Sequence, residues 1–118
     1  MKEVKRVIST IAANELIRSL KLKHGPLLFH QSGGCCDGSS PMCYQEKELL
    51  IGSNDLLLGH LEECPFYIVK SQYVYWKHTQ LIIDVVTGRG GMFSLEGVNG
   101  VRFLTRSRVF TDEERMFL

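Results

Sequence analysis

The feature that most constrains the fold is a helical apolar stripe that stops sharply and is followed by short apolar runs. Four apolar residues recur at i, i+3, i+4 and i+7: Ala13, Leu16, Ile17 and Leu20. Ser9 or Thr10 can cap the start of this helix, and Gly25 and Pro26 end it. Because the later runs are too short for long helices, the chain is predicted to adopt an α+β fold, with the N-terminal helix covering a mostly antiparallel sheet.

The short runs have the length and composition of strands. They are bounded by Gly, Asn, Pro or Ser and cover residues 27–31, 48–52, 55–62, 65–70, 80–86, 91–96 and 101–110. Residues 71–79 suit a helical turn with Tyr73 and Trp76 on one side. Residues 111–117 begin with Thr111 and acidic residues, which favours a short final helix.

Length and charge exclude several classes of function. A chain of 118 residues is the size of one domain, so residues 1–118 are predicted to fold as a single unit. A net charge of +1 offers no broad field for nucleic acid or an anionic membrane. No apolar run approaches the roughly 20 residues that cross a bilayer, and Asn14 and Glu15 interrupt any signal-peptide core. We therefore expect a cytoplasmic protein without a nucleic-acid or membrane partner.

The segment "HQSGGCCDGSSPMCY", from His30 to Tyr44, is the strongest candidate for a functional site. It holds three of the four cysteines, and its glycines Gly33, Gly34 and Gly38 allow a tight loop in which sulfurs converge. Thiolates are soft ligands for zinc, copper(I) or iron. The pattern therefore indicates a metal ion or iron–sulfur cluster held by Cys35, Cys36 and Cys43. His30 is the added ligand, with His60 and Cys64 as further candidates.

Two other interpretations of these cysteines stay open. Cys35 or Cys36 can act as a thiol nucleophile with His30 as its base, or the two adjacent thiols can form a labile disulfide switch. Alternatively, the cysteines are small apolar residues in a tight loop, and the chain is a structural interaction module. Cys64, just before an apolar strand, is predicted to belong to the core, and His78 to cap or pack.

The remaining motifs point to structure rather than chemistry. The glycines of "GRGG" at residues 88–91 suit a hairpin turn, and Arg102, Arg106 and Arg108 alternate along a strand as a solvated charged face. The chain has neither the phosphate-binding loop GxxxxGK[ST] nor a strand-linked GxGxxG. Nucleotide binding is therefore not predicted.

Three segments together resemble a bacterial family, the domain of unknown function 779: "HGPLLFHQSGGCCDGSSPMCY", "YWKHTQLIIDVVTGRGGMFSLEG" and "RFLTRSRVF". Members of that family are often labelled acetaldehyde dehydrogenase. The resemblance therefore implies an aldehyde dehydrogenase as a partner. This chain is too short for both a dinucleotide domain and a catalytic domain, so we expect an accessory protein of an aldehyde- or alcohol-oxidising system. A homo-oligomer is compatible with the sequence.

The order of a helix, "HGPLLFHQSGGCCDGSS", a run of strands and "LIIDVV" is similar to that of the A-type iron–sulfur carriers of the HesB-like fold. In this comparison Cys35 matches the cysteine of the carriers' glycine-rich loop. Their C-terminal Cys-Gly-Cys has no counterpart in "FTDEERMFL". The resemblance therefore implies a HesB-like fold and a site completed by Cys36, Cys43 and His30.

Overall fold

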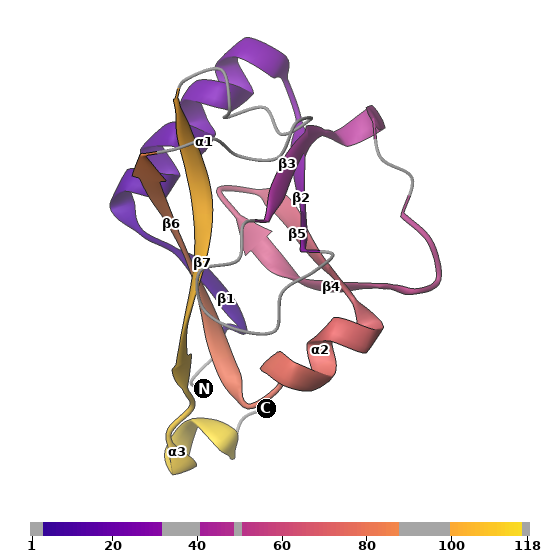
Figure 1. Ribbon diagram of the computed structural model, residues 1–118, viewed down its shortest axis with the longest axis vertical. Helices are drawn as coiled ribbons and strands as arrows, with labels where there is room; N and C mark the ends of the chain where they lie inside the picture. Colours follow the sequence, from indigo (N-terminus) through magenta and orange to yellow (C-terminus); the bar gives the residue numbers. More distant parts are fainter. Residues whose placement is uncertain (1–3, 32–40, 49–50, 88–99, 117–118) are drawn as a thin grey trace.

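The computed structural model describes residues 4–31, 41–48, 51–87 and 100–116. Within these ranges the chain forms two β-sheets and three α-helices, an α+β architecture (Figure 1). The predicted class is therefore confirmed. Segments 91–96 and 88–91, predicted as a strand and a hairpin turn, lie outside the described residues.

The first sheet has three strands in the order β1-β6-β7. Its strands are β1 (Val7–Ser9), β6 (Thr79–Thr87) and β7 (Val101–Val109). The long antiparallel pair β6 and β7 runs in register from Thr79 opposite Val109 to Thr87 opposite Val101. The short β1 joins β6 in parallel.

The second sheet has four strands in the order β3-β2-β5-β4. Its strands are β2 (Leu27–Gln31), β3 (Met42–Gln45), β4 (Asp55–Leu61) and β5 (Cys64–Val69). Strand β2 pairs with β3, and β4 pairs with β5, both in the antiparallel direction. Strands β2 and β5 are parallel neighbours and so join the two pairs into one sheet. Both sheets are thus mixed, and the predicted mostly antiparallel sheet is wrong. The parallel pairs join strands far apart in the chain, which local patterns do not reveal.

Helix α1 (Ile11–His24) forms where the apolar periodicity predicts it. Thr10 Oγ1 accepts a hydrogen bond from the Ala13 amide at 3.2 Å, which satisfies one of the donors left open in the first turn. Gly25 ends the helix at φ 79°, where its amide donates to the Lys21 carbonyl. The buried residues are three members of the predicted stripe: Ala13, Ile17 and Leu20. None of the described helices has the length and apolar content needed to cross a bilayer.

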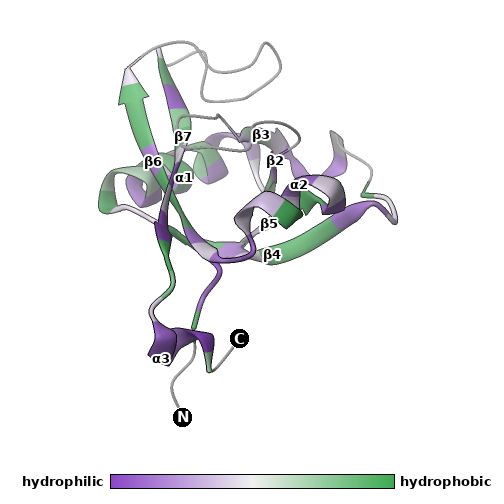
Figure 2. Cartoon of the chain, turned by 60° about the horizontal axis from the view of Figure 1, so that its bottom comes forward, coloured by the Kyte–Doolittle hydropathy of each residue, from purple (hydrophilic) through white to green (hydrophobic). Residues whose placement is uncertain are grey.

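The two shorter helices also confirm the predictions. In α2 (Lys70–Trp76), Trp76 is buried and Tyr73 packs against the core. Helix α3 (Asp112–Arg115) buries no residue and is almost entirely hydrophilic in Figure 2. It begins with a capping box, in which the side chains of Thr111 and Glu114 each accept from the other's backbone amide.

The core lies between the two sheets. Phe29 of β2 stacks on Phe66 of β5 at a ring distance of 6.1 Å and meets Phe103 of β7 edge to face at 5.1 Å. Thr105 donates to Gln31 at 2.9 Å, and both side chains are buried. Aromatic packing and a satisfied polar contact therefore join the sheets at the end of β2, just before the cysteine-rich segment.

Two local predictions are corrected. Residues 48–52 were expected to form a strand, but Glu48 ends the 3₁₀-helix η1 (Glu46–Glu48), and Ile51 and Gly52 are in no strand. The loop expected up to Tyr44 ends earlier, because Met42–Gln45 pairs with β2 as strand β3. Cys43 therefore lies in a sheet rather than in a loop.

Candidate functional site

His30 and Asp55 form a polar pair on the four-stranded sheet. Nε2 of His30 lies 2.7 Å from Oδ1 of Asp55, and the side chains are 14% and 15% exposed. In the register of the sheet, His30 lies opposite Tyr67 of β5. Asp55 lies opposite Val69, which is two residues further along the same strand. The two side chains therefore share the face opposite the Phe29 core and meet across β5.

A turn fixes Asp55 for this contact. The Gly52 amide donates to Asp55 Oδ2 at 3.0 Å, and the Asp55 amide donates back to the Gly52 carbonyl at 3.2 Å. The hydrogen bond from Gly52, followed by the one from His30, lowers the pKa of the Asp55 carboxyl below its usual 3.8. The carboxylate is therefore ionised near neutral pH and holds the imidazole in one orientation.

This geometry defines what His30 can do. An ionised carboxylate only accepts hydrogen bonds, so Nε2 of His30 carries a proton. In the neutral ring, Nδ1 then keeps its lone pair. A carboxylate that orients an imidazole in this way is the usual support of a metal-ligating histidine, and also of a general base.

Cys43 does not converge with His30. It pairs with Phe29, whereas His30 pairs with Met42, so successive residues of the two strands direct Cys43 and His30 to opposite faces. Cys43 is fully buried in the core. Cys35 and Cys36 lie outside the described residues. Of the four predicted ligands, the structure thus describes two, and they lie on adjacent strands but on different sides of the sheet.

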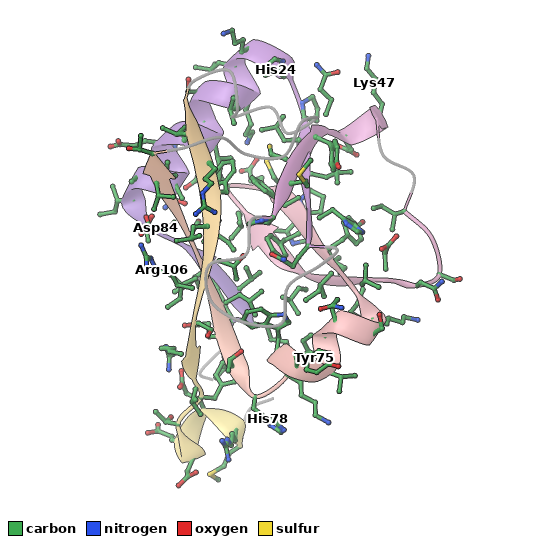
Figure 3. The ribbon with its side chains drawn as sticks, in the orientation of Figure 1. His24, Lys47, Tyr75, His78, Asp84 and Arg106 are labelled. Carbon is green, nitrogen blue, oxygen red and sulfur yellow. The ribbon has the colours of Figure 1, made fainter. Side chains whose placement is uncertain are left out.

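The other candidate ligands are dispersed. Cys64 is 2% exposed and belongs to the core cluster, as predicted, and burial raises the pKa of its thiol. His60 is exposed on β4, and His78 lies near the lower end of the molecule in Figure 3. Among the residues that the structure describes, no three His, Cys, Asp or Glu side chains gather as a metal site requires.

Asp55 was missed by the sequence analysis. It follows Gly-Ser-Asn, which signals a turn, and is the first residue of the predicted strand 55–62 and of β4. Its partner His30 is 25 positions away in the sequence. The turn was therefore readable, whereas the pairing depends on which strands are neighbours.

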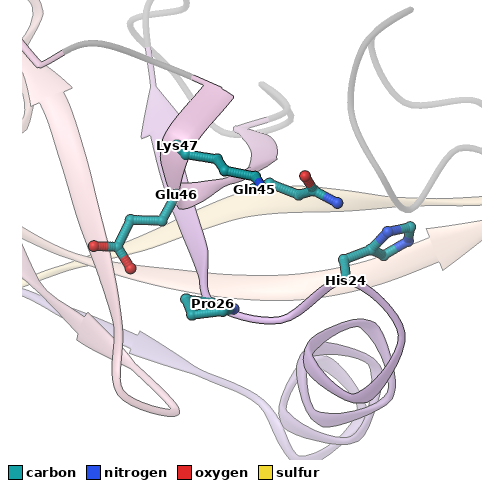
Figure 4. Close-up of a pocket in the computed structure, with 5 residues that line it drawn as sticks. All are labelled: His24, Pro26, Gln45, Glu46 and Lys47. Carbon is teal, nitrogen blue, oxygen red and sulfur yellow. The ribbon is translucent and has the colours of Figure 1, made fainter.

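A separate cavity of about 440 Å³ opens where α1 ends, beside β3 and η1. In Figure 4 the side chains of His24, Gln45 and Lys47 extend along one side, whereas Glu46 points the other way. Nε2 of His24 is buried and has no hydrogen-bond partner among the described residues. The cavity contains none of the predicted ligands, and Gln45 lies three residues beyond Met42, about 10 Å along β3 from the His30 pair.

Two arginines of the predicted face of β7, Arg106 and Arg108, are paired with carboxylates. Arg106 Nε donates to Asp84 at 3.0 Å, the contact labelled at the left of Figure 3. Asp84 also accepts from the capping residue Thr10 at 2.9 Å. Arg108 binds Glu114 through both terminal nitrogens and holds the pKa of that carboxyl down at about 2. These contacts secure the ends of α1 and α3 and give the arginines a structural role.

The sequence model of the family described as "Domain of unknown function (DUF779)" matches residues 16–109. The chain belongs to this family. No curated protein and no solved structure matches it. The residues matched by the domain of unknown function 779 include His30, Asp55 and all four cysteines, so the candidate site lies within the family domain.

The lowered pKa of Asp55 predicts a loss of stability in acid. Because its pKa is lower in the folded than in the unfolded chain, the unfolded chain binds more protons between the two values. The contribution of Asp55 to the free energy of unfolding is complete above a pH of about 3.8. It is lost as the pH falls through the pKa of Asp55 in the folded chain. Urea unfolding from pH 7 down to about pH 2 should therefore show a shallower acid decline for Asp55→Asn than for the natural chain.

Asp84 provides the comparison for this measurement. Its pKa is also lowered, first by the hydrogen bond from the Val85 amide and then by Arg106 and Thr10. Asp84→Asn should therefore also make the loss of stability in acid shallower, although Asp84 does not contact His30. An acid decline that Asp55→Asn leaves unchanged would show that Asp55 is not held in the way the structure describes.

Proposed function

We propose that this member of the domain of unknown function 779 family binds a metal ion or an iron–sulfur cluster through Nδ1 of His30 and the thiolates of Cys35 and Cys36. The observation that supports the proposal is the 2.7 Å contact between His30 Nε2 and Asp55, itself held by Gly52. Such a carboxylate fixes the orientation of the imidazole and thereby the nitrogen that is available to a metal.

The position of His30 in the chain also supports this ligand set. His30 is the second-last residue of β2, and Cys35 follows five residues later. Cys35 and Cys36 follow His30 by five and six residues, which span at most about 22 Å, so the chain length allows both thiols to fold back to the imidazole. Cys43 is left out of the set because its side chain lies on the core face. Two thiolates and one imidazole leave a fourth position open in a tetrahedral site, as transfer of the metal or binding of a substrate requires.

The wider role is proposed from family resemblance. We infer an accessory protein in the cytoplasm, beside an aldehyde dehydrogenase or a related alcohol-oxidising enzyme, and a fold related to the HesB-like carriers. Purification of the tagged chain from its native cells tests the partner. Recovery of an aldehyde dehydrogenase with it would support this role, and recovery of the chain alone would contradict it.

The contact between His30 and Asp55 also supports a second candidate function, a thiol nucleophile or a thiol switch. A base that is oriented by a carboxylate is the usual activator of a catalytic thiol, and His30 with Asp55 has that form. In this alternative Cys35 or Cys36 reacts as the thiolate, or the two form a disulfide with each other. The two candidates differ in whether the thiols are covered by a metal.

Metal content tests the leading proposal. Protein purified anaerobically without a histidine tag should contain about one metal ion or cluster per chain, and the double variant Cys35→Ser/Cys36→Ser should lose it, because two of the three soft or borderline ligands are gone. Cys43→Ala and Cys64→Ala should keep it, since both residues lie in the core. Metal-free natural protein, or loss of metal in Cys64→Ala but not in the double variant, would contradict the site.

Alkylation separates the two candidates. With metal bound, Cys35 and Cys36 should resist alkylation and become reactive together after chelation. As a thiol switch they should alkylate readily in the reduced protein, and mild oxidation should remove two thiols at once. Mass spectrometry of the peptide from His30 to Tyr44 distinguishes these results. Equal slow labelling of all cysteines under both treatments would contradict both candidates.

A further inference from the structure

Strands β1 and β4 bring the open edges of the two sheets together. β1 is an edge strand of the first sheet, β4 is an edge strand of the second, and the two pack against each other. Gly59 of β4 makes this approach possible, because a Cβ atom built on it would lie 2.9 Å from Cγ1 of Val7. The side chain of Val7 therefore packs directly on the backbone of Gly59.

The hydrogen bonds of β1 fix the direction of its backbone groups. The Arg6 carbonyl accepts from Leu81, and the Thr10 amide donates to the Ile83 carbonyl, both on β6. In a parallel pair, alternate residues bond to the same neighbour, so Ile8 also faces β6 and the amides of Val7 and Ser9 face away from it. Among the described residues, no backbone carbonyl accepts a hydrogen bond from either of these two amides.

Two adjoining cavities lie along this edge, with volumes of about 340 and 260 Å³. Lys5, Val7 and His60 line both of them, while Gly59 lines the larger and Ser9 the smaller. We call these two cavities, which share three lining residues, the β1–β4 groove. Val7, which is only 2% exposed overall, and Ser9 contribute to the β1 wall of the groove, and their amides face away from β6.

The charged groups around the groove favour an anion. Lys5 is exposed, and none of the described residues that line the larger cavity is acidic. Arg6 adds a positive charge and is held in place because it donates to the Tyr73 hydroxyl and lies over its ring. The smaller cavity includes Glu62, but both of its carboxylate oxygens accept from Arg18, at 3.0 and 3.2 Å. Among the described residues that line the groove, the charged side chains without an opposing ion-pair partner are therefore the basic ones, Lys5 and Arg6.

We propose that the β1–β4 groove binds the phosphate or carboxylate group of a small anion. The amides of Val7 and Ser9 donate to the anion, Lys5 supplies the opposing charge, and His60 completes the wall. Backbone amides together with an ammonium group are the usual partners of such anions. The site does not involve His30 or the cysteines, so its test stands apart from that of the proposed function.

An NMR titration of the amide groups tests this arrangement directly. With inorganic phosphate or acetate added to the full chain at constant ionic strength, the amides of Val7 and Ser9 should shift and saturate, while Ile8, bonded to β6, should shift little. Lys5→Gln should weaken binding about tenfold, the usual loss for one charge-assisted hydrogen bond. Lys23→Gln, a neutralised lysine in the last turn of α1 and outside both cavities, should leave the affinity unchanged.

The two probes also identify the anion. Tighter binding of phosphate than of acetate would assign the groove to phosphorylated molecules, and the reverse order would assign it to carboxylates. Shifts that do not saturate, that are as large at Ile8 as at its two neighbours, or that Lys23→Gln weakens as much as Lys5→Gln would overturn the proposal. The comparison of the three amides is made in the natural chain, so it does not depend on the folding of a variant.

Discussion

Replacing Phe29 with alanine is expected to lower the free energy of unfolding by about 3–5 kcal/mol. Phe29 is fully buried, and its ring contacts Phe66 in its own sheet and Phe103 in the other. The substitution removes the aromatic contact that joins the sheets and leaves a cavity that the surrounding strands can fill only in part. A loss of this size is a large share of the stability of a small domain, so partial unfolding at 37 °C is expected.

Tyr75 provides the matched control. It is also aromatic, but it is 63% exposed on α2, so Tyr75→Ala should change the free energy of unfolding by no more than about 0.5 kcal/mol (Figure 3). Urea unfolding followed by circular dichroism measures both variants. If Phe29→Ala cost no more than Tyr75→Ala, the sheets would not be joined through the Phe29 ring.

Helix α1 was predictable because all of its signals are local. Thr10 caps its own first turn, Gly25 ends the last one, and the apolar stripe needs only neighbours three and four positions apart. The capping box of α3 is local in the same sense. The strand "LLFHQ" was also predicted with the bounds it has in the structure, because Gly25 and Pro26 mark its start.

The pairing of strands could not be predicted in the same way. Apolar runs identify β2 and β5 as strands, but nothing within either run shows that the two are neighbours or that they run in parallel. Cys43 illustrates the consequence. Its proximity in the sequence grouped it with Cys35 and Cys36. In the structure it lies opposite Phe29 on the neighbouring strand, so its side chain is on the same face as Phe29 and points into the core.

The candidate site was predictable only as far as His30. Its position at the start of the cysteine-rich segment marked it as a ligand or base, whereas Asp55 was predicted only as the first residue of a strand. The partnership depends on β5 separating β2 from β4 by one strand, so that a histidine on one can reach a carboxylate on the other. Chemistry shared by two distant segments is therefore visible only after the sheet order is known.

The importance of Asp55 for the proposed site leads to the second prediction. If His30 ligates a metal through Nδ1, Asp55→Asn should weaken metal binding by about 10- to 100-fold, the usual effect of losing the carboxylate that supports a histidine ligand. The amide has nearly the same shape as the carboxylate, so the turn with Gly52 can persist while the charge opposite Nε2 is lost. Competition with a chromophoric chelator measures the affinity of the natural chain and of the variant.

Asp84→Asn controls for the general loss of a carboxylate. Asp84 also lies in a sheet and is hydrogen-bonded to a basic side chain, but that side chain is Arg106 and neither residue contacts His30. The affinity for metal should therefore be unchanged in Asp84→Asn while its stability falls. Equal weakening in the two variants would mean that metal binding follows the stability of the fold. No weakening in Asp55→Asn, with metal still bound, would mean that His30 is not a ligand supported by Asp55.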